Sequence, residues 1–242
     1  MSAPLLVAHR GAPRRGTREN TVRAFREALE AGADGVEMDV RLTRDGRLAV
    51  FHDAEAPKGG KRAPLRSLAY EDLRDPGVEV HDRVPTLEEA VRALLGRTGV
   101  VVEVKEPDIG GKVAAALLSL KAETRLKWLL LASFHPAALR DAARAAPGIR
   151  RALVVSSRGP GLGGWIRGRM PLGAWRSSGA QDLMPDKALA TAALVRAVGA
   201  AGGRVLPWTV NDPGRAERLL EAGCAGVITD DLGAVGPAVR QA

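Results

Sequence analysis

Acidic side chains with the spacing of a metal site occur in the apolar run 35–40. Glu37 and Asp39 stand two residues apart there, and alternate residues of a strand project to the same face. Two carboxylates on one face of a buried strand repel each other and lose their solvation. A divalent cation relieves both penalties, so the spacing predicts a cation site on this strand.

Two histidines flank this acidic pair. His9 and His52 each follow a short apolar run. An imidazole has an ordinary pKa of about 6.5 and can either accept or donate a proton near neutral pH, so both residues are candidates for acid/base catalysis. The alternative for each is a core histidine whose ring is satisfied by backbone hydrogen bonds. His81 and His135 are expected to be structural or solvated.

A set of short motifs appears in a fixed order along the chain. The first five are His9-Arg10-Gly11, Glu19-Asn20-Thr21, Glu37-x-Asp39-Val40, Thr43-Arg44-Asp45-Gly46 and His52-Asp53. Four more are Glu103-Val104-Lys105, Ser133-Phe134, Trp208-Thr209-Val210-Asn211 and Ile228-Thr229-Asp230. In order and spacing this set resembles the signature of glycerophosphodiester phosphodiesterases, from about residue 5 to residue 231. One departure is Arg18, where that family usually has proline.

The resemblance implies a role for each catalytic candidate. His9 and His52 would take a proton from the nucleophile and give one to the leaving alkoxide of a phosphodiester. Glu37, Asp39 and Glu103 would form an all-oxygen site, which suits Mg²⁺ or Ca²⁺ rather than zinc. The alternative for the three acids is that they are only solvated at strand ends.

Basic and aromatic residues would then bind the substrate. Arg10 and Lys105 should hold the non-bridging phosphate oxygens, and each could also form a salt bridge to Glu37 or Glu103. Trp208 is either an apolar wall for the glycerol moiety or an interior barrel residue. The Glu19-Asn20 pair either braces Arg10 or caps the first helix.

The elements that must position these residues alternate along the chain. Eight apolar runs are typical of core strands, at 5–8, 35–39, 100–104, 128–132, 151–155, 180–184, 204–208 and 226–228. Helical patterns occupy 19–31, 86–95, 111–121, 136–145, 187–201 and 215–222. Strands that alternate with helices predict a parallel sheet, and eight units fit an α/β fold of the closed (β/α)8 type, the TIM barrel. An open doubly wound sheet is the alternative, but no Gly-x-Gly-x-x-Gly follows the first strand.

The barrel prediction makes the candidates converge, because active sites of such barrels lie at the C-terminal ends of the strands. Asp45-Gly46 predicts a tight hairpin, which would fold the run 48–52 back against strand two and bring His52 over the barrel mouth. Residues 54–85 hold no clear barrel unit. We interpret them as a short insertion at one side of the mouth, within a single domain spanning residues 1–242.

A Gly- and Arg-rich stretch at 156–178 is expected to be irregular. Its two tryptophans, Trp165 and Trp175, would lie in a solvated loop rather than on lipid headgroups, because no amphipathic helix is evident there.

Composition limits the partners. The net charge of +8 favours anionic partners, but basic pairs such as Lys61-Arg62 lack the interleaved aromatics that stack on bases, so no nucleic-acid partner is expected. Cys224 is the single cysteine, which excludes an intrachain disulfide and suits a reducing compartment. No signal-peptide pattern or membrane-length apolar run is present, so we expect a cytoplasmic protein without stable membrane association.

The resemblance implies metal-dependent hydrolysis of a small-molecule glycerophosphodiester to glycerol 3-phosphate and an alcohol. A first alternative is a lysophospholipase D-like enzyme with the same site and a lysolipid substrate. A second is a barrel that binds phosphate-bearing ligands without turnover. Such a protein should lack a histidine or a metal acid of the signature, and neither is missing here.

Overall fold

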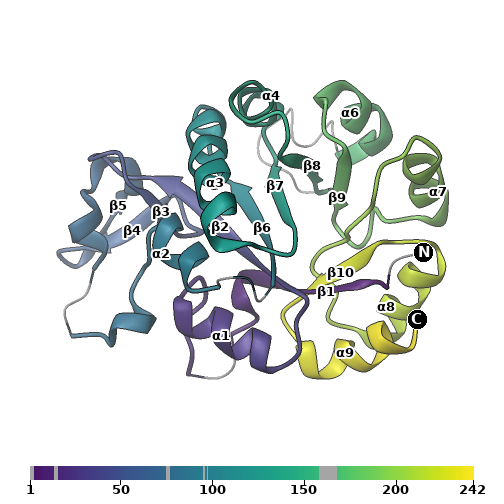
Figure 1. Cartoon of the computed structure of the whole chain (residues 1–242), viewed down its shortest axis with the longest axis horizontal. Coiled ribbons are helices and arrows are strands. Elements are labelled where there is room, and N and C mark those ends of the chain that lie inside the picture. Colours follow the sequence, from purple (N-terminus) through teal and green to yellow (C-terminus); the bar gives the residue numbers. More distant parts are fainter. Residues whose placement is uncertain (1–2, 14–15, 75–76, 95, 97, 158–167) are drawn as a thin grey trace.

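The computed structural model shows parallel strands with helices packed around them (Figure 1). It describes residues 3–13, 16–74, 77–94, 96, 98–157 and 168–242. The main sheet has the strand order β10-β1-β2-β6-β7-β8-β9. These strands are β1 (Leu5–Ala8), β2 (Gly35–Leu42), β6 (Gly99–Val104), β7 (Leu129–Ser133), β8 (Arg150–Val155), β9 (Asp182–Pro185) and β10 (Gly226–Thr229).

The segment 204–210 completes the barrel between β9 and β10. Parallel bridges join Val205 to Leu183 and Trp208 to Asp186. On the other side, the Ala225 amide donates to the Val205 carbonyl at 2.9 Å, and the Ile228 amide donates to the Pro207 carbonyl at 3.0 Å. The segment predicted as the seventh strand therefore takes that place in the ring, although it is joined by isolated bridges rather than by a continuous ladder. The (β/α)8 prediction is confirmed.

The helices lie outside the strands (Figure 1). They are α1 (Val22–Glu30), α2 (Leu87–Arg92), α3 (Gly110–Thr124), α4 (Pro136–Ala145), α6 (Pro171–Ser178), α7 (Ala192–Ala200), α8 (Pro213–Glu221) and α9 (Leu232–Gln241). Three of them, α1, α2 and α7, begin later than predicted because threonines cap them, and α2 begins one residue late, after Thr86. Thr21 accepts a hydrogen bond from the Ala24 amide, and Thr191 accepts one from the Leu194 amide. Residue 95, the predicted end of the second helix, lies outside the described residues.

Two of the helices in the described residues were not predicted. α6 lies in the stretch expected to be irregular, and its Trp175 is buried rather than solvated, so that expectation was wrong for this residue. Proline at the first helical position of α6 and the surrounding glycines hide the pattern. Trp165 lies outside the described residues. α9 contains Pro237, which also weakens its helical signal.

The core has an inner and an outer layer, set by the alternation of side chains along each strand. Leu130 and Ala132 of β7 belong to the cluster inside the barrel, while Leu129 and Leu131 pack outward with helix residues. The same alternation on β2 turns Val36 outward, toward the layer that contains the helices. Its neighbour Glu37 therefore faces the interior.

The segment after β2 differs from the barrel units. β3 (Leu48–Val50) pairs antiparallel with β2, as predicted, and ends two residues early. β4 (Glu55–Lys58) and β5 (Lys61–Pro64) then form a two-stranded hairpin that was not predicted. Its turn is Gly59-Gly60, with φ of +56° and +76°, a conformation that favours glycine. In Figure 1 this hairpin lies at one edge of the molecule, beyond β3.

Short 3-10 turns follow the hairpin, at Leu65–Ser67, Tyr70–Leu73 and Val80–Asp82. A small core of its own holds this segment against β3, formed by Ala49, Ala56, Leu65, Leu68, Tyr70, Leu73 and Val84. In the described part of the chain, no helix has the length and apolar character needed to cross a membrane.

Candidate active site

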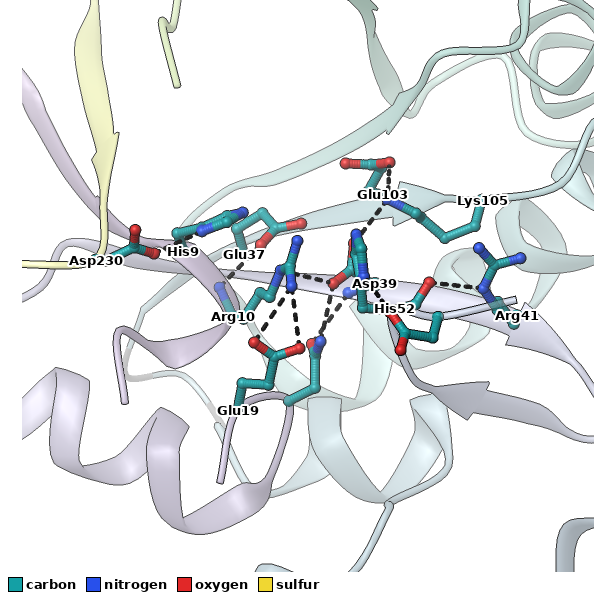
Figure 2. Close-up of polar contacts among 12 residues, drawn as sticks. His9, Arg10, Glu19, Glu37, Asp39, Arg41, His52, Glu103, Lys105 and Asp230 are labelled. Atoms are coloured by element: carbon teal, nitrogen blue, oxygen red, sulfur yellow. Dashed lines mark hydrogen bonds and ion pairs between the residues drawn. The ribbon is translucent and has the colours of Figure 1, made fainter. Parts of the chain in front are cut away.

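The predicted site residues converge at the C-terminal ends of the barrel strands (Figure 2). A cavity of about 170 Å³ opens there. It is lined by His9, Arg10, Glu37, His52, Glu103, Lys105 and Trp208, with Phe134, Val154, Met184 and Ile228. Asp39, the one predicted residue that does not line it, contacts Arg10 and Lys105 directly. The eight predicted residues thus come from five elements or their flanking turns.

A sharp turn places the first of these residues. Directly after β1, His9–Gly11 form a 3-10 turn in which Arg10 has a positive φ of +52°. Gly11 follows with φ of +87°, and a Cβ built there would lie 2.8 Å from the Cβ of Ala24. Only glycine fits both the backbone conformation and the contact with α1. The glycine of the His-Arg-Gly motif is therefore required by the backbone conformation of the turn. This turn brings Arg10 back over the strand ends.

The three acids form the cluster expected of a cation site. Glu37, Asp39 and Glu103 are 2%, 1% and 8% exposed, and their ligand atoms lie within 4.8 Å of one another. Oε1 of Glu37 is buried without a hydrogen-bond partner among the described residues. Burial, together with the charges of Asp39 and Glu103, raises the pKa of Glu37 to about 8. A buried, unsatisfied and electrostatically crowded carboxylate fits an ion-binding role.

Asp39 remains charged despite its burial. Burial alone would raise its pKa, but the cations of Lys105 and Arg10 outweigh burial and hold the pKa below the usual value. Its Oδ1 lies 3.3 Å from Nζ of Lys105, and its Oδ2 lies 3.3 Å from Nε of Arg10. Asn20 also donates to Asp39 at 2.8 Å. The carboxylate is thus oriented from two sides.

The two predicted phosphate-binding cations already hold acids. Nζ of Lys105 lies 2.6 Å from Oε1 of Glu103, which is the salt bridge foreseen as an alternative. Arg10 contacts Glu37 through its backbone amide at 2.9 Å, while its guanidinium donates to Glu19 at 3.0 Å. Glu19 therefore braces Arg10, and the helix cap falls on Thr21 instead. Both cations still line the cavity, so their N–H groups remain within reach of an anion there.

His9 has a carboxylate partner that the sequence analysis did not single out. Nδ1 of His9 lies 2.6 Å from Oδ1 of Asp230, at the end of β10. Burial lowers the pKa of His9, but the hydrogen bond to Asp230 and the charge of Glu37 outweigh it, so the net shift is upward. The Ile228-Thr229-Asp230 motif was the available signal. The pairing itself depends on closure of β1 against β10.

His52 is held by its backbone and by its neighbour. Its Nδ1 lies 2.9 Å from Oδ1 of Asp53, and Nε of Arg41 donates to its carbonyl oxygen at 2.7 Å (Figure 2). Nη1 of Arg41 also lies 3.6 Å from Oε1 of Glu106. The sequence analysis missed Arg41, because a single arginine on a strand gives no indication that it will reach across the hairpin.

Trp208 lies at the interior edge of the barrel and also lines the cavity. Its Nε1 donates to the Met184 carbonyl at 3.0 Å, which fixes the indole at the interior edge of the barrel. The ring packs edge-to-face on Phe134, with 5.7 Å between the ring centroids, and it lines the cavity. The two rings and Met184 give one side of the cavity an apolar wall.

The remaining histidines lie elsewhere. His81 is exposed and its Nε2 lies 3.1 Å from Nη1 of Arg26, while His135 occupies the position before α4. Neither lines the cavity.

Comparison with known proteins agrees with this geometry. The model of the "Glycerophosphoryl diester phosphodiesterase family" matches residues 9–234. The chain belongs to this family. Membership in the glycerophosphoryl diester phosphodiesterase family makes the chain an enzyme of the phosphodiesterase class.

Relatives of known name share most of the chain. It is 30% identical over 244 residues to the glycerophosphodiester phosphodiesterase of Caldanaerobacter subterraneus subsp. tengcongensis, covering 94% of each chain. A solved structure of an Oleispira antarctica phosphodiesterase in complex with the product sn-glycerol-3-phosphate is 25% identical. Its TM-score is 0.79, with 98% of this chain and 97% of that one covered. A glycerophosphodiester phosphodiesterase of Parabacteroides distasonis shares the fold at 24% identity and a TM-score of 0.79, with 99% of both chains covered.

Proposed function

We propose that the chain hydrolyses glycerophosphodiesters to glycerol 3-phosphate and an alcohol, with His9 and His52 as the acid/base pair and a bound divalent cation. The observation that carries this proposal is the lining of one cavity by both histidines, with three buried carboxylates beside them. Family membership supplies the reaction class.

Glu37, Asp39 and Glu103 would hold the cation, either Mg²⁺ or Ca²⁺, because both prefer carboxylate oxygens. When bound, the cation neutralises negative charge on the phosphate. The fit rests on the buried Oε1 of Glu37, which has no partner among the described residues. In the protein alone, Lys105 supplies part of the compensating charge through its contacts with Asp39 and Glu103.

The side chains around the cavity divide the remaining work. Arg10 and Lys105 bind the non-bridging phosphate oxygens and stabilise the charge that develops as the diester breaks. One histidine takes the proton of the nucleophile, and the other gives a proton to the leaving oxygen. Trp208 and Phe134 form the apolar wall on which the carbon side of the glycerol moiety packs.

The size of the cavity favours soluble diesters over lysolipids. About 170 Å³ accommodates a small polar group, whereas an acyl chain would need a long apolar track to bury its methylenes. The Oleispira relative holds sn-glycerol-3-phosphate, a small water-soluble molecule. We therefore place the lysophospholipase D-like alternative second. We also propose that the chain forms one catalytic domain, with residues 54–85 as an insertion beside the mouth.

A substrate panel tests the proposal. Glycerophosphocholine, glycerophosphoglycerol and lysophosphatidylcholine are each incubated with Mg²⁺, with Ca²⁺ and with EDTA. We expect release of glycerol 3-phosphate from the two soluble diesters only when a cation is present. Full turnover after exhaustive chelation, or a higher kcat/KM for the lysolipid, would contradict it.

A further inference from the structure

A groove leads from the active-site cavity toward the hairpin beyond β3. His52 lines both the cavity and an adjoining hollow of about 250 Å³, whose walls include Arg18, Phe51 and Arg62. A second hollow of about 420 Å³ shares Arg18 and Phe51 with the first and continues along Pro57–Gly59 of the hairpin. We call these two hollows together the side groove.

Two of the cations along the side groove are already neutralised. Nη2 of Arg62 lies 2.8 Å from Oδ2 of Asp53. Nζ of Lys58 lies 3.0 Å from Oδ2 of Asp72. Neither side chain therefore offers an uncompensated charge to a ligand.

Arg18 differs from these cations. Its guanidinium lies over the ring of Phe51, 6.0 Å from the ring centroid. Within residues 3–13, 16–74 and the later described ranges, no carboxylate oxygen comes within 4.0 Å of it and no acceptor is hydrogen-bonded to it. The aromatic face holds the guanidinium in place without neutralising its charge, and its planar set of donors stays open.

The position of the Arg18 charge on the groove wall relates Arg18 to the leaving group of the reaction. The interior end of the cavity is closed by Met184, Val154 and Ile228, so a substrate group of any length cannot extend there. The side groove begins at His52, one of the two proposed acid/base residues. A group that leaves the phosphorus on the His52 side would therefore lie along the wall that carries Arg18.

We infer that the side groove receives the leaving alcohol and that Arg18 binds a phosphate group carried by that alcohol. This inference rests on the proposed function and narrows its substrate class to glycerophosphodiesters whose alcohol is itself phosphorylated. A guanidinium binds a phosphate by paired, charge-assisted hydrogen bonds, which a neutral or cationic alcohol cannot accept. Arg18 is thus a specificity-determining residue.

A matched pair of substrates isolates this contact. Glycerophosphoinositol and glycerophosphoinositol 4-phosphate differ by one phosphate on the leaving alcohol. We expect the kcat/KM of the wild-type enzyme to be about 5- to 30-fold higher for the phosphorylated diester, and we expect high salt to reduce this ratio. In Arg18→Gln the ratio should fall close to one, while Arg18→Lys should keep part of it. Arg140→Gln, the same charge change on the exposed face of α4, should keep the wild-type ratio.

The outcomes separate this inference from the proposed function. Equal kcat/KM values for the two diesters in the wild type overturn the role of Arg18 alone. A parallel loss on both substrates in Arg18→Gln, with the ratio intact, also overturns it, because the residue would then be structural. A wild-type enzyme that cleaves glycerophosphocholine but neither inositol diester overturns this inference alone. One that cleaves neither glycerophosphocholine nor the inositol diesters with Mg²⁺ or Ca²⁺ overturns the proposed function, and the substrate class with it.

Discussion

Nδ1 of His9 and Oδ1 of Asp230 lie 2.6 Å apart, although the residues are separated by 221 positions in the chain. The contact joins the end of β1 to the end of β10. Asp230 is held in turn by Nδ2 of Asn211 at 3.0 Å. These hydrogen bonds fix the orientation of the His9 imidazole. The pKa of His9 is raised as well, since the hydrogen bond to Asp230 and the nearby negative charge outweigh the opposing effect of burial.

Asp230→Asn should lower the pKa of His9, because the lost negative charge favoured the imidazolium. The limb of the pH–rate profile that His9 governs should move to lower pH, whether His9 serves as acid or as base. We expect kcat to fall about 10- to 100-fold, part of the full worth of a positioned acid/base group. Asp231→Asn is the matched control, since that carboxylate caps α9 by accepting from the Ala234 amide. A profile unchanged in Asp230→Asn would remove Asp230 from the site.

The metal-free protein should lose stability as the pH rises, because of Glu37. Its pKa of about 8 in the folded protein lies above the ordinary value of 4.5. The unfolded chain releases this proton near its ordinary pKa, whereas the folded protein retains it. The associated stability is therefore complete below about pH 4.5 and declines as the pH approaches 8. With EDTA present, Tm should fall more steeply over this range for wild type than for Glu37→Gln. Equal slopes would show that Glu37 is not the group responsible.

A divalent cation should offset the loss of stability that the metal-free protein shows as the pH rises. Because the ion displaces the proton from Glu37, Mg²⁺ or Ca²⁺ should raise Tm more at pH 8 than at about pH 6. Turnover should disappear with chelation and return when the ion is restored, and Glu37→Gln should respond poorly to both changes. A wild-type Tm that is unchanged by the cation at both pH values would argue against the carboxylate site.

Replacing His9 or His52, the proposed acid/base pair, by alanine should lower kcat by about 10²- to 10⁴-fold. Both imidazoles line the cavity, and their removal takes away a proton-transfer group without disturbing the barrel core. His81→Ala is the control, since that side chain is exposed and contacts Arg26. If His9→Ala or His52→Ala kept nearly wild-type turnover, that histidine would be structural.

Motif residues were predictable because strand alternation fixes their direction. On β2, apolar residues at even positions pack outward, so the acids at 37 and 39 must face the interior, and Glu103 follows the same rule on β6. Partners from remote elements were not predictable. Asp230 reaches His9 only after the ring closes, and Arg41 reaches the His52 carbonyl only after β3 folds back on β2.

The elements of the fold that the sequence did not predict have local causes. Gly59-Gly60 was read as part of an irregular insertion, yet its two positive φ values are those of a tight hairpin turn. α6 and α9 carry glycine or proline within or beside them, which lowers their helical signal, and packing against the barrel overrides that propensity. Burial of Trp175 among core residues stabilises α6 in a way that composition does not reveal.

Arg41 should position His52, since its Nε donates to the His52 carbonyl and its exposure is only 13%. Arg41→Gln should lower kcat about tenfold, with a smaller change in KM, because a displaced general acid or base affects the transition state more than substrate binding. Arg41→Lys should recover little, as an ammonium cannot reproduce the guanidinium fork that also reaches Glu106. Arg44→Gln on the same hairpin is the control. A rise in KM with unchanged kcat would instead make Arg41 a binding residue.

Stability at the opposite end of the barrel should depend on Asp182. This fully buried carboxylate begins β9 and accepts from Nε and Nη2 of Arg150 at 2.6 Å each, and from Nη2 of Arg204 at 2.8 Å. Burial would raise its pKa, but these hydrogen bonds outweigh burial and lower it. Its stabilising contribution is therefore present above the ordinary pKa of 3.8 and is lost as the pH falls.

Asp182→Ala should reduce the free energy of unfolding by about 2–4 kcal/mol, because two guanidinium groups lose their shared partner and a buried site is left unfilled. The estimate stays below that for a fully buried pair, since both arginines are more than a third exposed to solvent. Denaturant unfolding measures the loss. Asp141→Ala, which breaks the surface pair with Arg144 on α4, should cost less than about 1 kcal/mol. Because neither Asp182 nor its two arginine partners line the cavity, kcat/KM measured well below Tm should stay near wild type. A large loss of activity in the folded variant would show that this end of the barrel also controls the geometry of the site.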